Sequence, residues 1–419
     1  MVSATGPVSG ASHTWTSFWT SVQVSHTMTW TADTREGRLL EGSALSKPTL
    51  RVVQYATGNV GSEMVGRIVE HPDLELVGLY CYSPEKVGRD VGDIVGIAPL
   101  GVAATNDIAD VLRVKPDVVN FNGVWPDIDT FCTLLENGIN VVTTSDWITG
   151  YHRDRNHPHP SGKKPTELIE AACRRGKATF YGTGMNPGLA QILSVVATAG
   201  MGRVDHITVL ETVDVSCHHS VDTWKNVGYG RPVDDPEVPG LLETGCAVFA
   251  DSIYMMADCF DLEIDDIAFD CELGACTEDV DLGWWTLPKG SVGGSLAKFK
   301  GVSHGEPKIE VHLEWQMTPK TEPGWKVQGC YITTIEGDPT IVNRHMIFPA
   351  TGMPHGAWTP EYFASVGMTI TGMPALNAIR SVCEAKPGLT TSADLPLRAF
   401  AGRFHDKART DASSVEVGP

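Results

Sequence analysis

Short apolar segments alternate with amphipathic ones from Thr49 onward, and this alternation constrains the fold more than any other feature of the sequence. Strands are predicted over residues 51–56, 74–80, 117–122, 140–145 and 177–184, and helices over 62–71, 127–138 and 166–176. Strands separated by helices indicate βαβ units. The first part of the chain is therefore predicted to form a parallel sheet covered by helices.

After Gly188 the segments become longer and richer in β-branched residues. Strands are predicted over 205–216, 308–318, 325–337 and 340–348, with a helix near 237–260 between them. Many of these segments alternate polar and apolar residues, which is typical of a sheet with one solvated face. A last helix, predicted over 372–388, is placed back on the first sheet. The expected fold class is α/β, with a second α+β domain built on a mixed or antiparallel open sheet.

Four regions of the chain are expected. Residues 1–48 are rich in Ser, Thr and Gly, lack the features of a signal peptide, and are predicted to be a disordered extension. A nucleotide-binding domain is predicted over 49–187 and is completed by about 350–404. The second domain covers 188–349, and residues 405–419 form a flexible tail.

Charge and cysteine content exclude several classes of partner. The 419 residues include 32 basic and 51 acidic side chains, giving a net charge of −19. Nucleic acids and anionic membranes bind clustered Lys and Arg, so neither partner is expected. No apolar run is long enough to span a bilayer. The ten cysteines lack C-x-x-C pairs, which favours reduced thiols and a cytoplasmic location.

The segment A-T-G-N-V-G at 56–61 joins the first predicted strand to the first predicted helix. A dinucleotide turn needs small residues there, and a helix N-terminus whose free N–H groups point at the pyrophosphate. Ala56 stands where the first glycine of the fingerprint is usual. The expected cofactor contacts are Thr57, Gly58, Asn59, Val60 and Gly61. The alternative is a glycine-rich turn without a ligand.

The end of the second strand carries Cys81 where an acidic residue would bind the ribose of NAD. A missing carboxylate removes repulsion against a 2′-phosphate, and hydroxyl and cationic side chains can hold one. Tyr82, Ser83 and Lys86 are therefore expected to contact NADP, with NAD as the other possibility. The alternative for Lys86 is a solvated helix face.

Five segments together carry a family resemblance: VVQYATGNVGSEM, SPEKVGRDVGDIVG, VVTTSDW, YGTGMNPGL and TGMPALNAI. Over residues 49–403 the chain resembles the dihydrodipicolinate reductase-like family, most of all its 2,4-diaminopentanoate dehydrogenase and native amine dehydrogenase branch. The resemblance implies a Rossmann domain, a dimer interface on the α+β domain and a homodimer. It implies NAD(P)H-dependent reductive amination of small ketones or aldehydes with ammonia, and the reverse deamination of amines.

Two departures from the family bear on chemistry. The His-rich and Lys-Asp-Ala-Pro-Ser-Gly segments of true dihydrodipicolinate reductases are absent, so reduction of their cyclic imine is not expected. The amine dehydrogenases have a glutamate after the strand that matches residues 140–145, and this chain has Asp146. By that resemblance Asp146 is the catalytic candidate. It would stabilise an iminium cation and shuttle protons. Burial beside Trp147 is expected to raise its pKa. The alternative is an Asp that caps the turn.

Other candidates follow the ends of the strands. By resemblance, Asn122 and Gly123 contact the nicotinamide side. Asn186 either caps a helix, which we favour, or faces the cofactor amide. Trp147 and Tyr151 either form an apolar wall of the substrate pocket or are ordinary core aromatics.

The segment 151–164 contains three histidines and is interpreted as a mobile surface loop that could act as a lid; no metal site is expected. The C-H-H-S segment at 217–220 either faces the cleft or has a local structural role, and we favour the latter. Two other functions stay open. One is an NADP-dependent reductase of a carbonyl (C–O) substrate, and the other is a non-catalytic nucleotide-binding protein.

Overall fold

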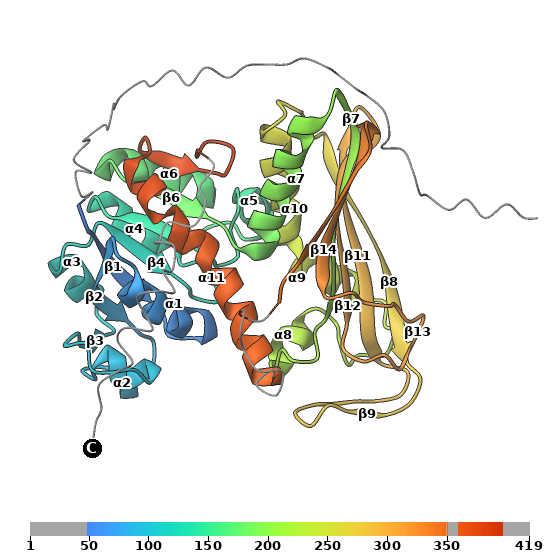
Figure 1. Cartoon of the computed structure of the whole chain (residues 1–419), viewed down its shortest axis with the longest axis horizontal. Helices are drawn as coiled ribbons and strands as arrows, with labels where there is room; N and C mark the ends of the chain where they lie inside the picture. Colours follow the sequence, from blue (N-terminus) through green and yellow to red (C-terminus); the bar gives the residue numbers. More distant parts are fainter. Residues whose placement is uncertain (1–47, 349, 351–358, 397–419) are drawn as a thin grey trace, which may run out of the picture. The chain divides into compact units, whose positions relative to one another are not determined.

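The computed structural model describes residues 48–348, 350 and 359–396 (Figure 1). The predicted disordered extension over 1–48 lies outside the described residues apart from Pro48, as does the predicted tail over 405–419. The described part of the chain forms two seven-stranded sheets and a small two-stranded one.

The first sheet is parallel throughout, with the order β3–β2–β1–β4–β5–β6–β16. Its strands are β1 (Leu50–Tyr55), β2 (Leu74–Tyr80), β3 (Ala104–Thr105), β4 (Val118–Phe121), β5 (Asn140–Thr143), β6 (Thr179–Gly182) and β16 (Gly388–Thr390). The chain builds outward from β1 in one direction and then from β4 in the other. Ligands of such sheets bind beyond the carboxyl ends of the strands, at this switch between β1 and β4.

Helices cover both faces of this sheet. They are α1 (Asn59–Glu70), α2 (Val91–Val95), α3 (Ile108–Arg113), α4 (Ile128–Glu136), α6 (Pro165–Gly176) and α11 (Pro360–Glu384), with a 3₁₀ turn at Pro84–Lys86. A further helix, α5 (Tyr151–Asn156), packs against α6 and against α10 (Ala247–Asp258) of the second domain. Met64 and Ile68 of α1 pack with Leu376 and Ile379 of α11 in one apolar core. The opposite face packs a core with side chains from α3, α4 and α6. The sheet is therefore buried on both sides, which explains its continuous apolar strands.

The second large sheet has the order β13–β8–β11–β12–β7–β14–β15. Its strands are β7 (Arg203–Asp214), β8 (Asp266–Cys276), β11 (Val292–Ser303), β12 (Glu306–Gln316), β13 (Thr321–Glu322), β14 (Cys330–Asp338) and β15 (Ile341–Met346); β9 (Val280–Asp281) and β10 (Thr286–Leu287) form the small sheet. β7 and β12 pair in parallel, and the other pairs are antiparallel, so the sheet is mixed.

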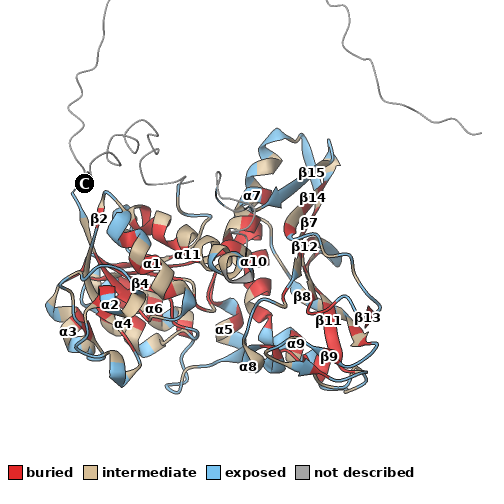
Figure 2. Ribbon diagram, turned by 60° about the horizontal axis from the view of Figure 1, so that its bottom comes forward, coloured by how far each residue is buried: buried red, intermediate tan, exposed pale blue. Residues whose placement is uncertain are grey.

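One face of the mixed sheet packs against helices, and the buried positions run along α10 and the strands beneath it (Figure 2). The helices of this region are α7 (Ala190–Ala197), α8 (Val221–Asn226), α9 (Val238–Gly245) and α10 (Ala247–Asp258). The other face carries polar side chains such as His206, Glu310 and His312. The expected fold class is confirmed.

Several elements differ from the sequence-based expectation. β8 and β11 were not predicted, because glycines and charged residues interrupt their apolar pattern. The helix expected near 237–260 is two helices that meet at Cys246. The helix expected over 372–388 begins at Pro360 and ends at Glu384, and Gly388 starts a strand instead. The proposed domain boundaries stay a prediction. No helix in the described ranges combines the length and apolar character that crossing a membrane requires.

Candidate active site

The turn after β1 has the backbone of a nucleotide-binding turn. Ala56 has φ +74°, a left-handed conformation that costs a residue with a side chain roughly 1 kcal/mol. Gly58 precedes α1, whose first turn carries neither a side-chain cap nor an acidic residue. The first N–H groups of α1 therefore remain free for an anion.

The two glycines of this turn have different structural roles. A Cβ added to Gly61 would lie 2.2 Å from the carbonyl oxygen of Ala56, so only glycine lets α1 pack against the turn. A Cβ added to Gly58 would meet no atom of the described residues within 4 Å. One glycine thus serves packing, and the other leaves the backbone open on the side where a ligand would approach.

A cavity of about 520 Å³ lies beside this turn. Thr57, Gly58 and Asn59 line it together with the segment 217–220 and with Ala364, Ser365 and Met368 of α11. The C-H-H-S segment therefore faces the cleft, which was the less favoured of its two interpretations. Val60 contacts the apolar core between α1 and α11 instead of lining the cavity.

Lys86 reaches back to the same turn. Its Nζ donates to Thr57 Oγ1 at 2.9 Å. This contact favours the cofactor interpretation of Lys86 over a solvated helix face. Cys81 is buried, whereas Tyr82 is 55% exposed and stands edge-on to Tyr55. Ser83 precedes the 3₁₀ turn and makes no side-chain cap there.

Asn122 belongs to a buried amide cluster at the end of β4. Its Oδ1 accepts from Gln54 Nε2 at 2.9 Å and from Asn120 Nδ2 at 3.0 Å, and its Nδ2 donates to Thr144 Oγ1 at 2.8 Å. A Cβ on Gly123 would lie 2.7 Å from the ring of Phe121. The cluster fixes the backbone at the switch point, and the Asn122 side chain is already engaged within it.

Asp146 follows β5 and is held by two cationic side chains. Its Oδ2 lies 3.1 Å from His152 Nε2 and 2.8 Å from Arg153 Nη1, and its side chain is 17% exposed. Burial favours the neutral carboxyl, but the hydrogen bond and charge of His152 and the charge of Arg153 outweigh it and lower the pKa. The expected rise in this pKa is therefore wrong, because both cations come from a segment that was interpreted as a loop.

That segment is ordered against the second sheet's helices. Residues 151–156 form α5, and His152 is buried within it, so the mobile-loop expectation is wrong for these residues. Asp251 of α10 accepts the backbone N–H groups of Gly150 and His152, each at 2.7 Å. The buried Asp251 carboxylate thus neutralises the N-terminus of α5 and holds the helix in place.

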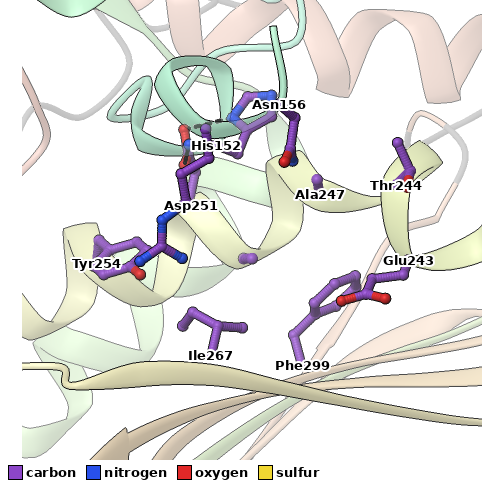
Figure 3. Close-up of a pocket in the computed structure, with 11 residues that line it drawn as sticks. His152, Asn156, Glu243, Thr244, Ala247, Asp251, Tyr254, Ile267 and Phe299 are labelled. Carbon is purple, nitrogen blue, oxygen red and sulfur yellow. Dashed lines mark hydrogen bonds and ion pairs between the residues drawn. The ribbon is translucent and has the colours of Figure 1, made fainter. Parts of the chain in front are cut away.

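His152 lies between two carboxylates. Its Nδ1 is 2.9 Å from Asp251 Oδ2, on the side of the ring away from Asp146. Burial lowers its pKa, but hydrogen bonds and charge from Asp146 and Asp251 prevail and raise the pKa to about 9. Figure 3 shows His152 and Asp251 at the wall of a second cavity of about 330 Å³, with Tyr254 and Phe299. His152 is thus a cation at neutral pH that links Asp146 to α10.

The two expected aromatics are in different surroundings. Trp147 is fully buried in the core of the parallel sheet, edge-on to Phe180. The structure thus favours a core aromatic over a pocket wall for Trp147. Tyr151 is 45% exposed and stands edge-on to Tyr254 at 5.1 Å.

Asn186 does not cap a helix. α7 begins at Ala190 after the turn Met185–Leu189 and has no side-chain cap. The Asn186 amide instead donates to Glu211 of β7 and accepts from Gln191 Nε2 at 2.7 Å. The capping expectation, which was favoured, is therefore wrong.

Sequence reasoning missed Glu211, His152 and Asp251. A signal existed for the two acids: Glu211 interrupts an apolar strand, and Asp251 interrupts the apolar helix AVFADSIYMM. Across the described ranges no group of three His, Cys, Asp or Glu side chains is arranged to hold a metal ion.

Comparisons with known proteins place this chain in a family. Residues 189–410 match the model of the 2,4-diaminopentanoate dehydrogenase C-terminal domain, which covers more than half of the chain. The chain belongs to this family. Residues 52–155 also match the model of the dihydrodipicolinate reductase N-terminus. The predicted family is confirmed.

Individual relatives agree with this assignment. An amine dehydrogenase of Streptomyces virginiae is 28% identical over 85% of this chain and 99% of its own length. A 2,4-diaminopentanoate dehydrogenase of Acetoanaerobium sticklandii is 24% identical over 88% of this chain and 99% of its own length. The expected enzyme class, an oxidoreductase acting on CH–NH2 groups, is confirmed, and the comparisons support a nicotinamide cofactor.

The same fold occurs in a solved structure. The amine dehydrogenase of Mycobacterium smegmatis superimposes with a TM-score of 0.63 at 20% identity, covering 84% of this chain and 98% of that one.

Proposed function

We propose that this enzyme is an NADP-dependent amine dehydrogenase. It joins ammonia to small ketones or aldehydes by reductive amination and deaminates amines in the reverse direction. The names of the family and of the two relatives support the reaction class. The observation that carries the proposal is Asp146, a partly buried anion three residues after the end of β5, at the carboxyl edge of the parallel sheet.

The turn after β1 fits a dinucleotide. The free N–H groups of α1 and the open face of Gly58 would hold its pyrophosphate. Lys86 stands over this turn and would meet a 2′-phosphate, which supports NADP. When bound, the cofactor supplies the hydride that the substrate carbon receives.

Asp146 provides a fixed negative charge at this edge. Reductive amination passes through an iminium cation, and a preorganised carboxylate in a partly buried site stabilises that charge. His152 and Arg153 keep Asp146 ionised. This role is narrower than the expected one, because a carboxylate with a lowered pKa is a poor proton carrier near pH 7. A homodimer and a cytoplasmic location stay predictions from the resemblance and from the cysteine pattern.

One assay separates this proposal from its alternatives. The absorbance of NADPH is followed with cyclohexanone or a small aldehyde, with and without ammonium. Oxidation that depends on ammonium is expected. Equal oxidation without ammonium would assign the enzyme to carbonyl reduction, and binding without turnover would assign it to nucleotide binding alone.

A further inference from the structure

A second carboxyl group, Glu211 of the mixed sheet, contacts the turn that follows β6 of the parallel sheet, and the mechanism above does not use it. Glu211 lies in the C-terminal half of β7, directly opposite Tyr331 of β14. Side chains alternate along a strand, so Glu211 shares the face of the buried Ile207 and Val209. A carboxyl group on an apolar face needs partners that compensate for its lost hydration.

The partners of Glu211 are uncharged. The Asn186 amide donates to Oε2, and the Trp315 indole Nε1 donates to Oε1 at 3.2 Å. Gln191, itself buried, fixes Asn186 from the other side. Within the part of the chain that the structure describes, no Lys, Arg or His forms an ion pair with Glu211. Burial raises its pKa to about 7, against the smaller opposing effect of the two hydrogen bonds.

Glu211 and Asp146 lie near the ends of two adjacent strands. β5 and β6 pair side by side; Asp146 follows β5, and Asn186, which donates to Glu211, follows β6. Besides burial, the charges of both carboxyl groups raise the pKa of the thiol of Cys246, which lies where α9 meets α10. Among the described residues, the titratable groups that face Glu211 are Cys246 and Tyr331, and burial raises the pKa of each, so both are neutral near pH 7. Of the residues that the structure describes, two are cationic partners of Asp146 and none is a cationic partner of Glu211. Two carboxyls in such contrasting surroundings are suited to separate roles, one as a fixed anion and one as an acid and base.

We propose that Glu211 carries the protons of the amination steps while Asp146 stays ionised; the inference rests on the proposed amine dehydrogenase function. The nitrogen lone pair of ammonia attacks the carbonyl carbon, the C=O π pair moves to oxygen, and Glu211 gives that oxygen its proton. The Glu211 carboxylate then takes a proton from the new ammonium nitrogen.

Glu211 next returns this proton to the hydroxyl oxygen of the carbinolamine. The C–O bond breaks, its electron pair leaves with water, and the nitrogen lone pair forms the C=N bond of the iminium ion. Solvent reprotonates Glu211 before the next turnover. The overall reaction therefore consumes one proton from solution, as the balance of reductive amination requires.

The Glu211→Gln variant tests this assignment because, in amine deamination, hydride transfer precedes the steps that need Glu211. In the deamination direction hydride leaves the amine before water adds to the iminium ion. With a small amine and NADP at high pH, the variant should show a burst of about one NADPH per site. Steady turnover should then be about 100-fold slower than in the wild type. The Glu272→Gln variant removes an exposed carboxylate from the same sheet and serves as the matched control.

The outcomes separate the two proposals. A wild-type enzyme that oxidises no amine would overturn the proposed function, and this inference with it. Two results with an active wild type would overturn the inference alone. One is a Glu211→Gln variant with unchanged turnover. The other is a Glu211→Gln variant whose burst and steady rate fall to the same extent.

Two readouts do not depend on the Glu211→Gln turnover. Trp315→Phe removes the indole donor to the charged carboxylate, so the kinetic pKa of kcat/KM should rise by about one unit; an unchanged pH profile would contradict the proposal. Without any cofactor, the wild type should lose stability relative to Glu211→Gln as the pH rises from 4.5 to about 7. A difference that does not vary with pH would show that Glu211 does not titrate in this range.

Discussion

Replacing His152 by Gln should change how the stability of this enzyme depends on pH. The imidazole side chain is only 4% exposed and lies between the carboxylates of Asp146 and Asp251. Gln is of similar size and keeps polar atoms near both partners, but it carries no charge. The variant therefore removes the titration of His152 and keeps most of the packing.

The magnitude follows from the shift of the His152 pKa. Folding raises this pKa from 6.5 to about 9. At 1.36 kcal/mol for each unit, the interaction contributes about 3 kcal/mol to the free energy of unfolding. Because the folded state binds the proton more tightly, the contribution is complete below pH 6.5 and is lost as the pH rises through 9.

Urea unfolding followed by tryptophan fluorescence at about pH 6 and about pH 9.5 measures this effect. The wild type should have a higher free energy of unfolding than His152→Gln, and this difference should be about 3 kcal/mol larger at the lower pH than at the higher one. The matched control is His159→Gln, which removes an ion pair to the exposed Asp129. Surface pairs contribute about 0–1 kcal/mol, so the control should show little pH dependence. If the wild type and His152→Gln differ in free energy of unfolding by the same amount at both pH values, His152 is not charged in the folded protein.

Three further variants test the rest of the site. Asp146→Asn should bind NADPH as the wild type does, by calorimetry, and lose most of its amination rate, on the order of 100-fold; unchanged turnover would remove Asp146 from its role. Gly61→Ala places a Cβ 2.2 Å from the Ala56 carbonyl oxygen, so the turn must shift. The affinity for NADPH, measured by fluorescence titration, should therefore fall at least about tenfold. An affinity equal to that of the wild type would show that the turn does not hold the cofactor. Lys86→Ala should weaken NADPH binding about tenfold and NADH binding much less, and equal losses would indicate that Lys86 supports only Thr57.

Local spacing made the turn after β1 predictable. The pattern of Ala56, Gly58 and Gly61 lies within six residues, between a strand and a helix that each show their own periodicity. Turn geometry depends on residues adjacent in sequence, so a single segment is enough to predict it. Asp146 was found in the same way, because it directly follows a recognisable strand.

The surroundings of the catalytic candidate could not be predicted in this way. Asp251, which holds α5, is 99 positions from His152 in the sequence. His152 and Arg153 looked like members of a polar loop, and no local pattern showed that they would be buried against Asp146. The predicted direction of the Asp146 pKa was wrong for this reason.

The sequence by itself therefore determined the strand and helix periodicity, the parallel sheet and the glycine turn after the first strand, since each depends on neighbours a few residues apart. Only the tertiary structure decided which carboxyl groups are charged. Hydration and ionic partners set a pKa, and for Asp146, His152 and Glu211 they include residues that folding brings together from distant segments.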